Sequence, residues 1–484
     1  MAQGKRAVID RRSFFDAILK IIIIFIGGYM GVSFFYRIKT VFAALIMLIV
    51  CFPLLSFAAE DQLKQLEQKI EAIEKKTDDL EKEIRMEHKP LLKEISEHIT
   101  TLEKELDTVD YRTARIKALG EKVEAFSIGG DLSLFLQGIG NNSKGYGEKA
   151  DASYSGDLFL ITPAGPYGNV YFRGAVGEGA GIAPLLPPTF SGPNADLGFN
   201  EPKFELVEAW YWTEFAIPDI RDKRLELTIG KMDPTALFDT NKVANSETNQ
   251  FLANIFVNNL AIEFGGDGNG YGPGLSTAYR FTSVYEKGLK VVGRIGIFEG
   301  NGDFKDVLDK PFLIAELDIW RPYYGLNGNY RIYGWVNKKD HTDLLDSSKD
   351  NLSNQGAGLS IDQQVSNDIT LFARYGFQDK DVSKFDQIFT IGGQIIGNSW
   401  RMANDVIGIA YGASHVSSKY KEASLGLDGY AANADYEQYL EAYYKYWANK
   451  NLSISPDLQY VINPGGDNAK DSIFIYGVRM QATF

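Results

Sequence analysis

The chain ends in Ser472-Ile473-Phe474-Ile475-Tyr476-Gly477-Val478-Arg479-Met480-Gln481-Ala482-Thr483-Phe484, and this segment carries its clearest structural signal. In an extended strand one face would hold Phe474, Tyr476, Val478, Met480, Ala482 and Phe484, and the other face would hold Arg479, Gln481 and Thr483. An apolar face toward lipid and a polar face toward water is typical of a strand in a membrane barrel. A half-buried strand of a soluble sandwich alternates in the same way, so the rest of the chain has to distinguish the two.

The composition favours a barrel and excludes one class of partner. Among 484 residues there are 26 Tyr, 30 Phe and 48 Gly, a bias that aromatic girdles and Gly-rich turns produce in outer-membrane barrels. The formal net charge is −13, with both signs interspersed, so there is no basic patch for nucleic acid. No cofactor and no metal site is expected.

The amino terminus has two apolar stretches, residues 17–36 and 41–57. The second follows Arg37 and Lys39 and ends in small residues suited to cleavage before Ala59, as in a secretory signal. We therefore expect residues 1–58 to be a signal peptide. The first stretch has no obvious use, so Met30 is an alternative start and a long signal or anchor is the other interpretation. Lipid attachment at Cys51, the one cysteine, is disfavoured because a small residue rather than Val50 should precede it.

Residues 59–125 are rich in Glu, Lys and Leu and predict a coiled coil. Apolar residues follow a 3-4 spacing, at Leu63, Leu66, Ile70, Ile73, Leu80 and Ile84. Pro90 interrupts the helix, after which the pattern resumes in a shifted phase. A helix folded back at Pro90 into a hairpin is the alternative. The segment is expected in the periplasm, and mixed Leu and Ile along its seam is compatible with two or three strands, including a homotrimer.

From residue 126 to 484 the pattern predicts an all-β, 16-stranded antiparallel transmembrane β-barrel. The expected strands are residues 128–139, 154–162, 168–176, 203–217, 223–232, 272–282, 289–298, 311–320, 324–337, 353–364, 369–378, 387–397, 404–413, 436–448, 451–462 and 472–484. Their connections alternate between short turns and long loops, as in a bacterial outer-membrane barrel with short periplasmic turns. A barrel of this size leaves an aqueous channel.

The side chains that line this channel follow from the alternation. A charge facing lipid at mid-bilayer would cost roughly 2 to 4 kcal/mol, so charged residues must face inward. The predicted lining is Arg173, Glu208, Trp210, Trp212, Arg294, Glu316, Asp318, Arg331, Tyr333, Trp335, Arg374, Glu441, Lys445, Asp457, Gln459 and Arg479. Aromatic surfaces beside charged groups suit the apolar faces and hydroxyls of sugars, although girdle packing is an alternative for each aromatic residue.

The long connection at residues 233–259 is expected to narrow the channel. Its apolar residues, among them Phe238, Phe251 and Phe256, cannot stay in water, so the segment should fold into the barrel. That path would bring Asp239, Asn241 and Asn245 toward the inward arginines Arg173, Arg294 and Arg331, with Trp210 and Trp212 nearby.

Two segments resemble a known family. Gly230-Lys231-Met232-Asp233-Pro234, continuing to Asn259, resembles the long loop of carbohydrate-selective porins of the OprB type. Tyr443-Tyr444-Lys445, continuing to Gly466, resembles that family's penultimate strand and following loop. The resemblance covers roughly residues 126–484 and implies a sixteen-stranded pore for sugars, narrowed by inward loops. Leu260 to Phe264 replaces a stretch where members often carry prolines, which leaves the local path of the loop open.

Two other classes of function compete with a channel. An enzyme is disfavoured because His341 and His415 lie alone in expected external loops and no GxSxG or HExxH motif occurs. A structural protein, with the coiled coil as spacer and the barrel as anchor, remains the alternative, and contact with peptidoglycan would have to come from the coiled coil. The terminal Phe484 resembles the signal that the barrel-assembly machinery reads.

Overall fold

The computed structural model describes Lys75 and residues 127–140, 149–165, 167–196, 202–216, 224–266, 270–281, 288–305, 307–424 and 435–484. The predicted signal peptide lies outside the described residues, as does the predicted coiled coil apart from Lys75. The remaining described residues all belong to one compact unit that spans Ala114–Phe484. Each is therefore discussed as part of the predicted barrel domain.

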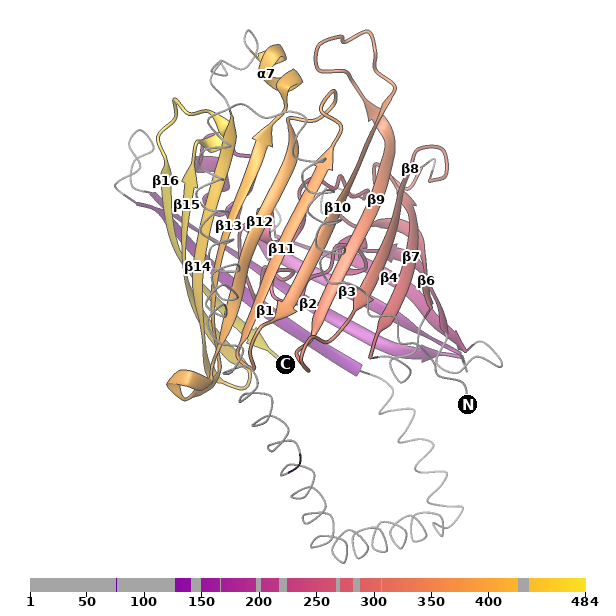
Figure 1. Ribbon diagram of the computed structural model, residues 1–484, viewed down its shortest axis with the longest axis vertical. Helices are drawn as coiled ribbons and strands as arrows, with labels where there is room; N and C mark the ends of the chain where they lie inside the picture. Colours follow the sequence, from indigo (N-terminus) through magenta and orange to yellow (C-terminus); the bar gives the residue numbers. More distant parts are fainter. Residues whose placement is uncertain are drawn as a thin grey trace, which may run out of the picture. The chain divides into compact units, whose positions relative to one another are not determined.

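Sixteen antiparallel strands close into one barrel, in which each strand pairs with its neighbours in sequence and β1 pairs with β16 (Figure 1). This confirms the predicted fold. The strands are β1 Ser127–Ile139, β2 Lys149–Ala164, β3 Gly168–Glu178, β4 Lys203–Ala216, β5 Arg224–Met232, β6 Gly272–Arg280, β7 Lys290–Glu299, β8 Pro311–Trp320, β9 Gly328–His341, β10 Leu352–Gln364, β11 Ile369–Gln378, β12 Phe385–Gly397, β13 Met402–Val416, β14 Tyr436–Asn449, β15 Leu452–Ile462 and β16 Ile473–Thr483.

Short helical turns occur in the connections. They are η1 Ala183–Leu185, η2 Pro234–Ala236, α5 Asn254–Val257, η3 Asn398–Trp400, α7 Ser418–Ser424 and η4 Pro464–Gly466. In the part of the chain that the structure describes, no helix is both long enough and apolar enough to cross a membrane.

The alternation of apolar and polar residues explains why these segments form barrel strands. In β1, the side chains of Leu132, Leu134 and Leu136 are 43 to 51% exposed on the outer face. Their neighbours Ser133 and Gln137 are buried on the inner face. The inner and outer faces therefore follow the period of two that the sequence predicted.

The barrel closes through the carboxy-terminal strand. Leu134 of β1 pairs with Met480 of β16, and the ladder continues past the end of the strand. The backbone N–H of Phe484 donates to Gly130 O at 3.0 Å, and the N–H of Gly130 donates to Phe484 O at 3.1 Å. The terminal residue is thus part of the closing ladder, while its ring stays exposed.

Most strand boundaries agree with the prediction within three residues, but β2 begins at Lys149 rather than residue 154, and β9 is displaced at both ends. The expected strand 324–337 begins instead at Gly328 and runs to His341. Tyr323 and Leu326 exchange two backbone hydrogen bonds across Tyr324 and Gly325, which both have positive φ angles. A tight turn therefore occupies the predicted start of the strand. The prediction was wrong here because the apolar and aromatic residues of this segment resemble a strand pattern.

Candidate pore constriction

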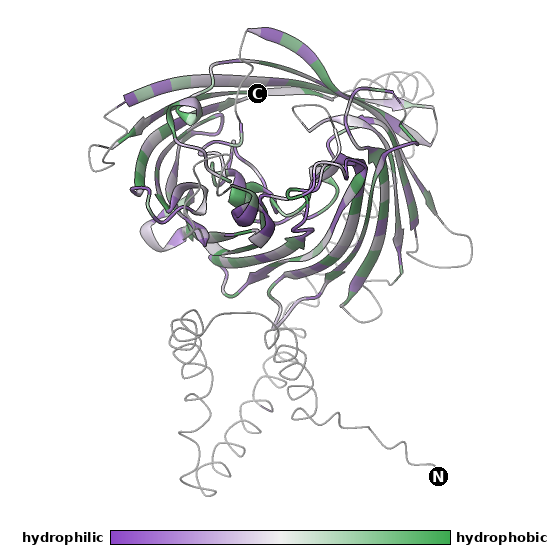
Figure 2. Cartoon of the chain, turned by 90° about the horizontal axis from the view of Figure 1, so that it is seen from above, coloured by the Kyte–Doolittle hydropathy of each residue, from purple (hydrophilic) through white to green (hydrophobic). Residues whose placement is uncertain are grey.

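The connection between β5 and β6 folds into the barrel, and its residues 233–264 are called the inward loop below (Figure 2). It begins with Asp233, whose carboxylate accepts hydrogen bonds from the backbone N–H and hydroxyl of Thr235 at 2.8 and 2.7 Å. Pro234 occupies the first position of η2, where its missing N–H costs nothing. Burial raises the pKa of Asp233 to about 6.

Apolar side chains hold the inward loop against the wall in two clusters. The first joins Phe251, Ile255 and Phe256 to inward residues of β11 to β16, including Phe372 and Tyr443. The second joins loop residues to strands β5 and β7 to β9, and its members are Met232, Phe238, Ile262, Phe298, Phe312, Ile314, Tyr333 and Trp335. The expected burial of the loop's apolar residues inside the barrel is therefore what the structure shows.

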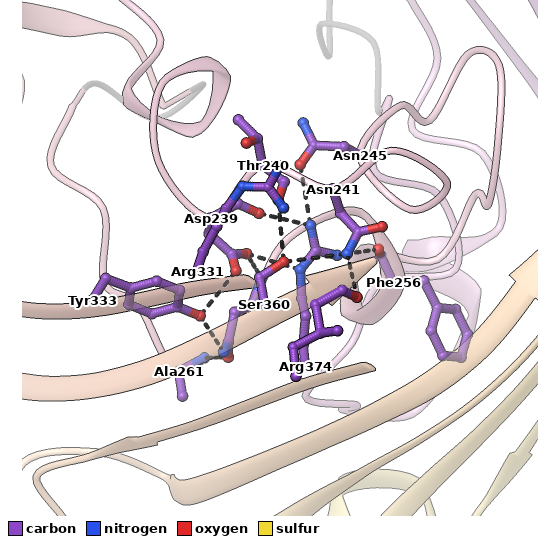
Figure 3. A network of polar contacts seen from close by, with 12 residues as sticks. Asp239, Thr240, Asn241, Asn245, Phe256, Ala261, Arg331, Tyr333, Ser360 and Arg374 are labelled. Carbon is purple, nitrogen blue, oxygen red and sulfur yellow. Dashed lines mark hydrogen bonds and ion pairs between the residues drawn. The ribbon is translucent and has the colours of Figure 1, made fainter. Parts of the chain in front are cut away.

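Arg374 of β11 is the polar centre of this packing, and its side chain is completely buried (Figure 3). Its Nε lies 3.1 Å from Asp239 Oδ2 as an ion pair. Its terminal nitrogens donate to Phe256 O and Asp239 O, both at 2.8 Å, and to Asn245 Oδ1 at 3.1 Å. One guanidinium therefore fixes three separate points of the inward loop.

Asp239, the loop residue that pairs with Arg374, also forms hydrogen bonds with three other residues. The Asp239 carboxylate accepts hydrogen bonds from Asn259 N at 2.8 Å and from the hydroxyl of Tyr333 at 2.9 Å. Its own N–H donates to Glu316 Oε2 of β8 at 2.8 Å. Burial raises the pKa of Asp239, although Arg374 favours the charged carboxylate. Asp239 has φ 57°, a strained left-handed conformation that these contacts maintain.

Strands β14 and β16 hold the other end of the inward loop. The Glu441 carboxylate accepts from Leu252 N at 2.5 Å and from Ala253 N at 3.0 Å. Arg479 donates to Glu247 O at 2.5 Å and to Gln250 O at 2.9 Å. These inward charges bind loop backbone rather than solute.

A second loop also folds inward, and its described residues 179–196, between β3 and β4, are called the companion loop. Glu437 of β14 accepts from the backbone N–H groups of Phe190 and Ser191 at 2.9 and 3.0 Å. The two inward segments also pair with each other, since Ala195 N donates to Leu252 O at 2.7 Å. The inward path of this loop was not predicted, although the apolar run Ile182-Ala-Pro-Leu-Leu186, in a connection that should face water, indicates it.

Several predicted lining residues are therefore covered by loop rather than open to water. They face inward as expected, but Glu208, Glu316, Arg331, Tyr333, Trp335, Arg374, Glu441, Lys445, Asp457, Gln459 and Arg479 are all buried. Lys445, for example, donates to Asn249 Oδ1 of the inward loop at 2.6 Å. The period of two reveals which side of the wall a residue faces, but it does not show whether a loop covers that residue.

The expected partners of the loop's polar residues also need correction. Asp239 and Asn245 meet Arg374, and Asn241 donates to Ser360 Oγ and Ile361 O at 3.2 Å. Arg173, Arg294 and Arg331 instead pair with strand carboxylates. The inward loop passes along β10 and β11, which brings it to the arginine of β11.

Part of the wall on β2 to β4 keeps partly exposed side chains, and five residues there form what is called the constriction set: Asp157, Tyr171, Arg173, Glu208 and Trp210. Glu208 is the buried member, and it accepts a hydrogen bond from Asp233 N of the inward loop at 3.4 Å. The Arg173 guanidinium, 22% exposed, lies 2.7 Å from Asp157 and 3.2 Å from Glu208. Trp210 donates its indole N–H to Glu208 at 3.0 Å and stacks on Tyr171, with ring centroids 4.6 Å apart. Cationic, anionic and aromatic surfaces thus lie side by side.

Two backbone features place the constriction set. The register between β3 and β4 shifts after the Arg173–Glu208 pair, leaving Val207 as the extra residue of a bulge, which is common beside functional sites. On β5, Gly230 has φ 143°, and a side chain there would collide with the carbonyl oxygen of Ala209. Only glycine therefore fits next to Trp210. Trp212, two residues further toward the periplasmic end of β4, pairs across strands with Thr228.

Nearer the periplasmic ends of the strands, the inner wall carries a second group of charges. Arg294 of β7 lies 3.6 Å from Glu226. Arg331 of β9 donates to Asp362 at 2.8 Å and lies 3.6 Å from Asp318, which remains 31% exposed. These residues keep the inward position that the sequence predicted for them.

Two loop carboxyl groups near the constriction set make its charge depend on pH. Burial, together with the nearby charge of Glu247, raises the pKa of Asp196 to about 7, and burial also raises the pKa of Glu247. Asp196 loses its proton as the pH rises through about 7, so the cation preference of the channel is expected to increase over that range. Reversal potentials in a salt gradient would measure it. In Asp196→Asn the dependence should flatten; an unchanged dependence there would contradict this origin.

The two histidines set aside as isolated are not isolated. His341 ends β9 and its Nε2 lies 2.8 Å from Glu263 of the inward loop. His415 lies in β13, with Nδ1 2.6 Å from Asp386. Both side chains therefore tie strand ends to neighbouring segments, so the expected placement in free external loops is wrong.

Comparisons with known proteins agree with this architecture. The sequence profile described as "Carbohydrate-selective porin, OprB family" matches residues 64–484. Porin B of Pseudomonas aeruginosa is 27% identical over 199 residues, which cover 34% of this chain and 44% of that protein, so the match spans less than half of that relative. A high-pH structure of OprB from Pseudomonas putida superimposes with a TM-score of 0.64 at 18% identity, covering 78% of this chain and 98% of that one.

Proposed function

Because the chain belongs to the OprB family of carbohydrate-selective porins, we propose that it is a channel for passive diffusion of small sugars and other polar solutes. Its location is the outer membrane. The observation that carries the proposal is the arrangement of the two inward segments. They are fixed to the wall from β7 to β16 by buried hydrogen bonds and apolar contacts, and most of the constriction set on β2 to β4 remains partly exposed.

The constriction set has the chemistry that a sugar needs. A sugar ring presents apolar C–H faces, which pack on the stacked Trp210 and Tyr171. Its hydroxyl groups both donate and accept hydrogen bonds, and Arg173, Asp157 and Glu208 offer both kinds of partner. These charged groups already satisfy one another, so a passing solute exchanges contacts without leaving a charge unpaired. Such a surface binds weakly, as conduction requires.

Two substitutions test this constriction in planar bilayers. Trp210→Ala should weaken the block of ion current by glucose, because the stacking surface is lost. Arg173→Gln should increase cation preference, because Asp157 and Glu208 lose the cation between them. Trp400→Ala, the same change in the periplasmic turn η3, is the control. If both substitutions leave selectivity and glucose block as in the wild type, these residues do not line the path.

In this proposal the segment before the barrel adds a second role, which is to join copies of the chain and to contact peptidoglycan. The predicted coiled coil of residues 59–125 would pair with further copies of the chain, as a homotrimer for example, and could reach peptidoglycan. Phe484 would be read by the barrel-assembly machinery before it joins the closing ladder with Gly130. A purely structural anchor is the weaker alternative, since an anchor has no need of charged and aromatic side chains that stay partly exposed on the inner wall.

A further inference from the structure

A small pocket lies on the inner wall at the periplasmic ends of β7, β8 and β9. It has a volume of about 220 Å³ and is lined by Lys290, Val292, Asp318, Trp320 and Asn329. Trp320 pairs across strands with Lys290 on one side and with Asn329 on the other. The pocket is therefore built on three adjacent strands and is separate from the constriction set on β2 to β4.

Neither the lipid interface nor the two apolar clusters explains the position of Trp320. It follows Glu316 and Asp318 at a spacing of two and so shares their inward face. An aromatic residue on the water side of the wall cannot anchor the barrel in the lipid interface. Trp320 also belongs to neither of the two apolar clusters beneath the inward loop. The ring is thus placed beside polar groups rather than in a core.

The polar groups around Trp320 are held in fixed orientations. Asn329 donates its amide to Asp362 Oδ1 at 3.0 Å, which fixes the amide plane. The Asp318 side chain is 31% exposed, and its Oδ2 lies 3.6 Å from Arg331, too far for a hydrogen bond. An exposed carboxylate oxygen that is not saturated by its ion pair can accept a hydrogen bond from a hydroxyl group. Lys290 adds an ammonium donor at the pocket's edge.

We propose that this pocket is a subsite for a single hexose ring at the periplasmic mouth, where a sugar pauses as it leaves the channel. An apolar ring face beside a few oriented donors and acceptors is what a sugar ring requires. The volume is below the roughly 300 to 1,000 Å³ of clefts that enclose larger ligands, which limits the occupant to about one ring. This inference rests on the proposed passage of sugars and adds a second binding position to it.

The test is side-specific block by glucose of the full-length protein in planar bilayers. Glucose added on the periplasmic side should block the wild-type current, and in Trp320→Ala this block should be about tenfold weaker, equivalent to about 1.4 kcal/mol. Block from the extracellular side should not change, because the constriction set is intact. Trp320→Phe should keep most of the periplasmic block, and Trp400→Ala, outside the pocket, should keep all of it.

The outcomes separate the subsite from the channel. If wild-type protein shows glucose block from both sides and Trp320→Ala retains the full periplasmic block, the subsite is wrong and the channel stands. If glucose neither blocks nor permeates the wild-type protein, the proposed function itself fails. Asn329→Ala leaves the indole in place and serves as the second variant. Should Trp320→Ala not assemble into a heat-modifiable barrel, an unchanged periplasmic block in Asn329→Ala would overturn the subsite.

Discussion

Replacing Arg374 with methionine is expected to free the inward loop and to raise single-channel conductance. The substitution leaves the Asp239 carboxylate fully buried without its cation, and breaking a buried pair in this way typically costs about 3 to 5 kcal/mol. It also removes the donors for Phe256 O and Asn245 Oδ1. The strand ladder does not depend on this side chain, so the barrel should still form. Conductance and proteolysis of the loop in intact membranes would measure the release.

Two further variants make this result specific. Asp239→Asn combined with Arg374→Met removes both charges, so the double variant should be less perturbed than Arg374→Met alone. Arg294→Met removes an arginine whose partner, Glu226, is partly exposed, and should leave loop protection unchanged. Wild-type conductance and protease resistance in Arg374→Met would show that the apolar clusters alone retain the loop.

The wall of this barrel carries charges that bind loop backbone. Glu437 and Glu441 of β14 accept from N–H groups of the two inward segments, while Arg374 and Arg479 donate to their carbonyl groups. Irregular backbone inside a barrel needs such partners, because its polar groups are otherwise unsatisfied where the loop buries them. The buried charges therefore let two loops with only short helical turns remain at membrane depth.

The strands and their inward faces were predictable from the sequence because both follow from a period of two. In β16, Arg479 and Gln481 are buried while Val478 and Met480 are exposed, as the alternation predicted. The path of the inward loop was not predictable, since it depends on contacts between residues far apart in the chain. Arg374 and Asp239 are 135 positions apart, and no local pattern indicates that they meet. The same reason explains why Tyr333 and Trp335, expected to line water, lie under the loop.

The constriction set was only partly recognised. Arg173, Glu208 and Trp210 were identified by their inward parity, whereas Asp157 and Tyr171 were not. Asp157 is an inward charge on β2, where it lies opposite Asp131 of β1, and the rule that charges face inward already applies to it from the sequence. Tyr171 shares the inward parity of Arg173, but its role depends on the strand register, which sets it directly beside Trp210.

Deletion of residues 240–253 is expected to give a wider channel that no longer responds to sugars. The segment supplies Phe251 to the apolar packing and backbone partners to Glu441 and Arg479. Without this segment, the charged inward side chains of β14 and β16 would face water. Inward side chains of a porin are normally in contact with water, so this exposure should be tolerated. The deletion ends lie close together, because Arg374 contacts both Asp239 and Phe256, so a short Gly-Ser bridge can join them.

Removal of this segment separates the loop's contribution from that of the strands. All sixteen strand pairs are retained, so the variant should still run as a heat-modifiable barrel. Ion conductance should increase severalfold, and glucose should no longer reduce the current, because the wall opposite the constriction set is gone. A matched control shortens the exposed connection between β9 and β10 by deleting residues 345–349, which should change neither property. A stable 240–253 deletion with wild-type conductance and glucose response would place the narrowest point outside this loop, and the role proposed for the constriction set would fall with it.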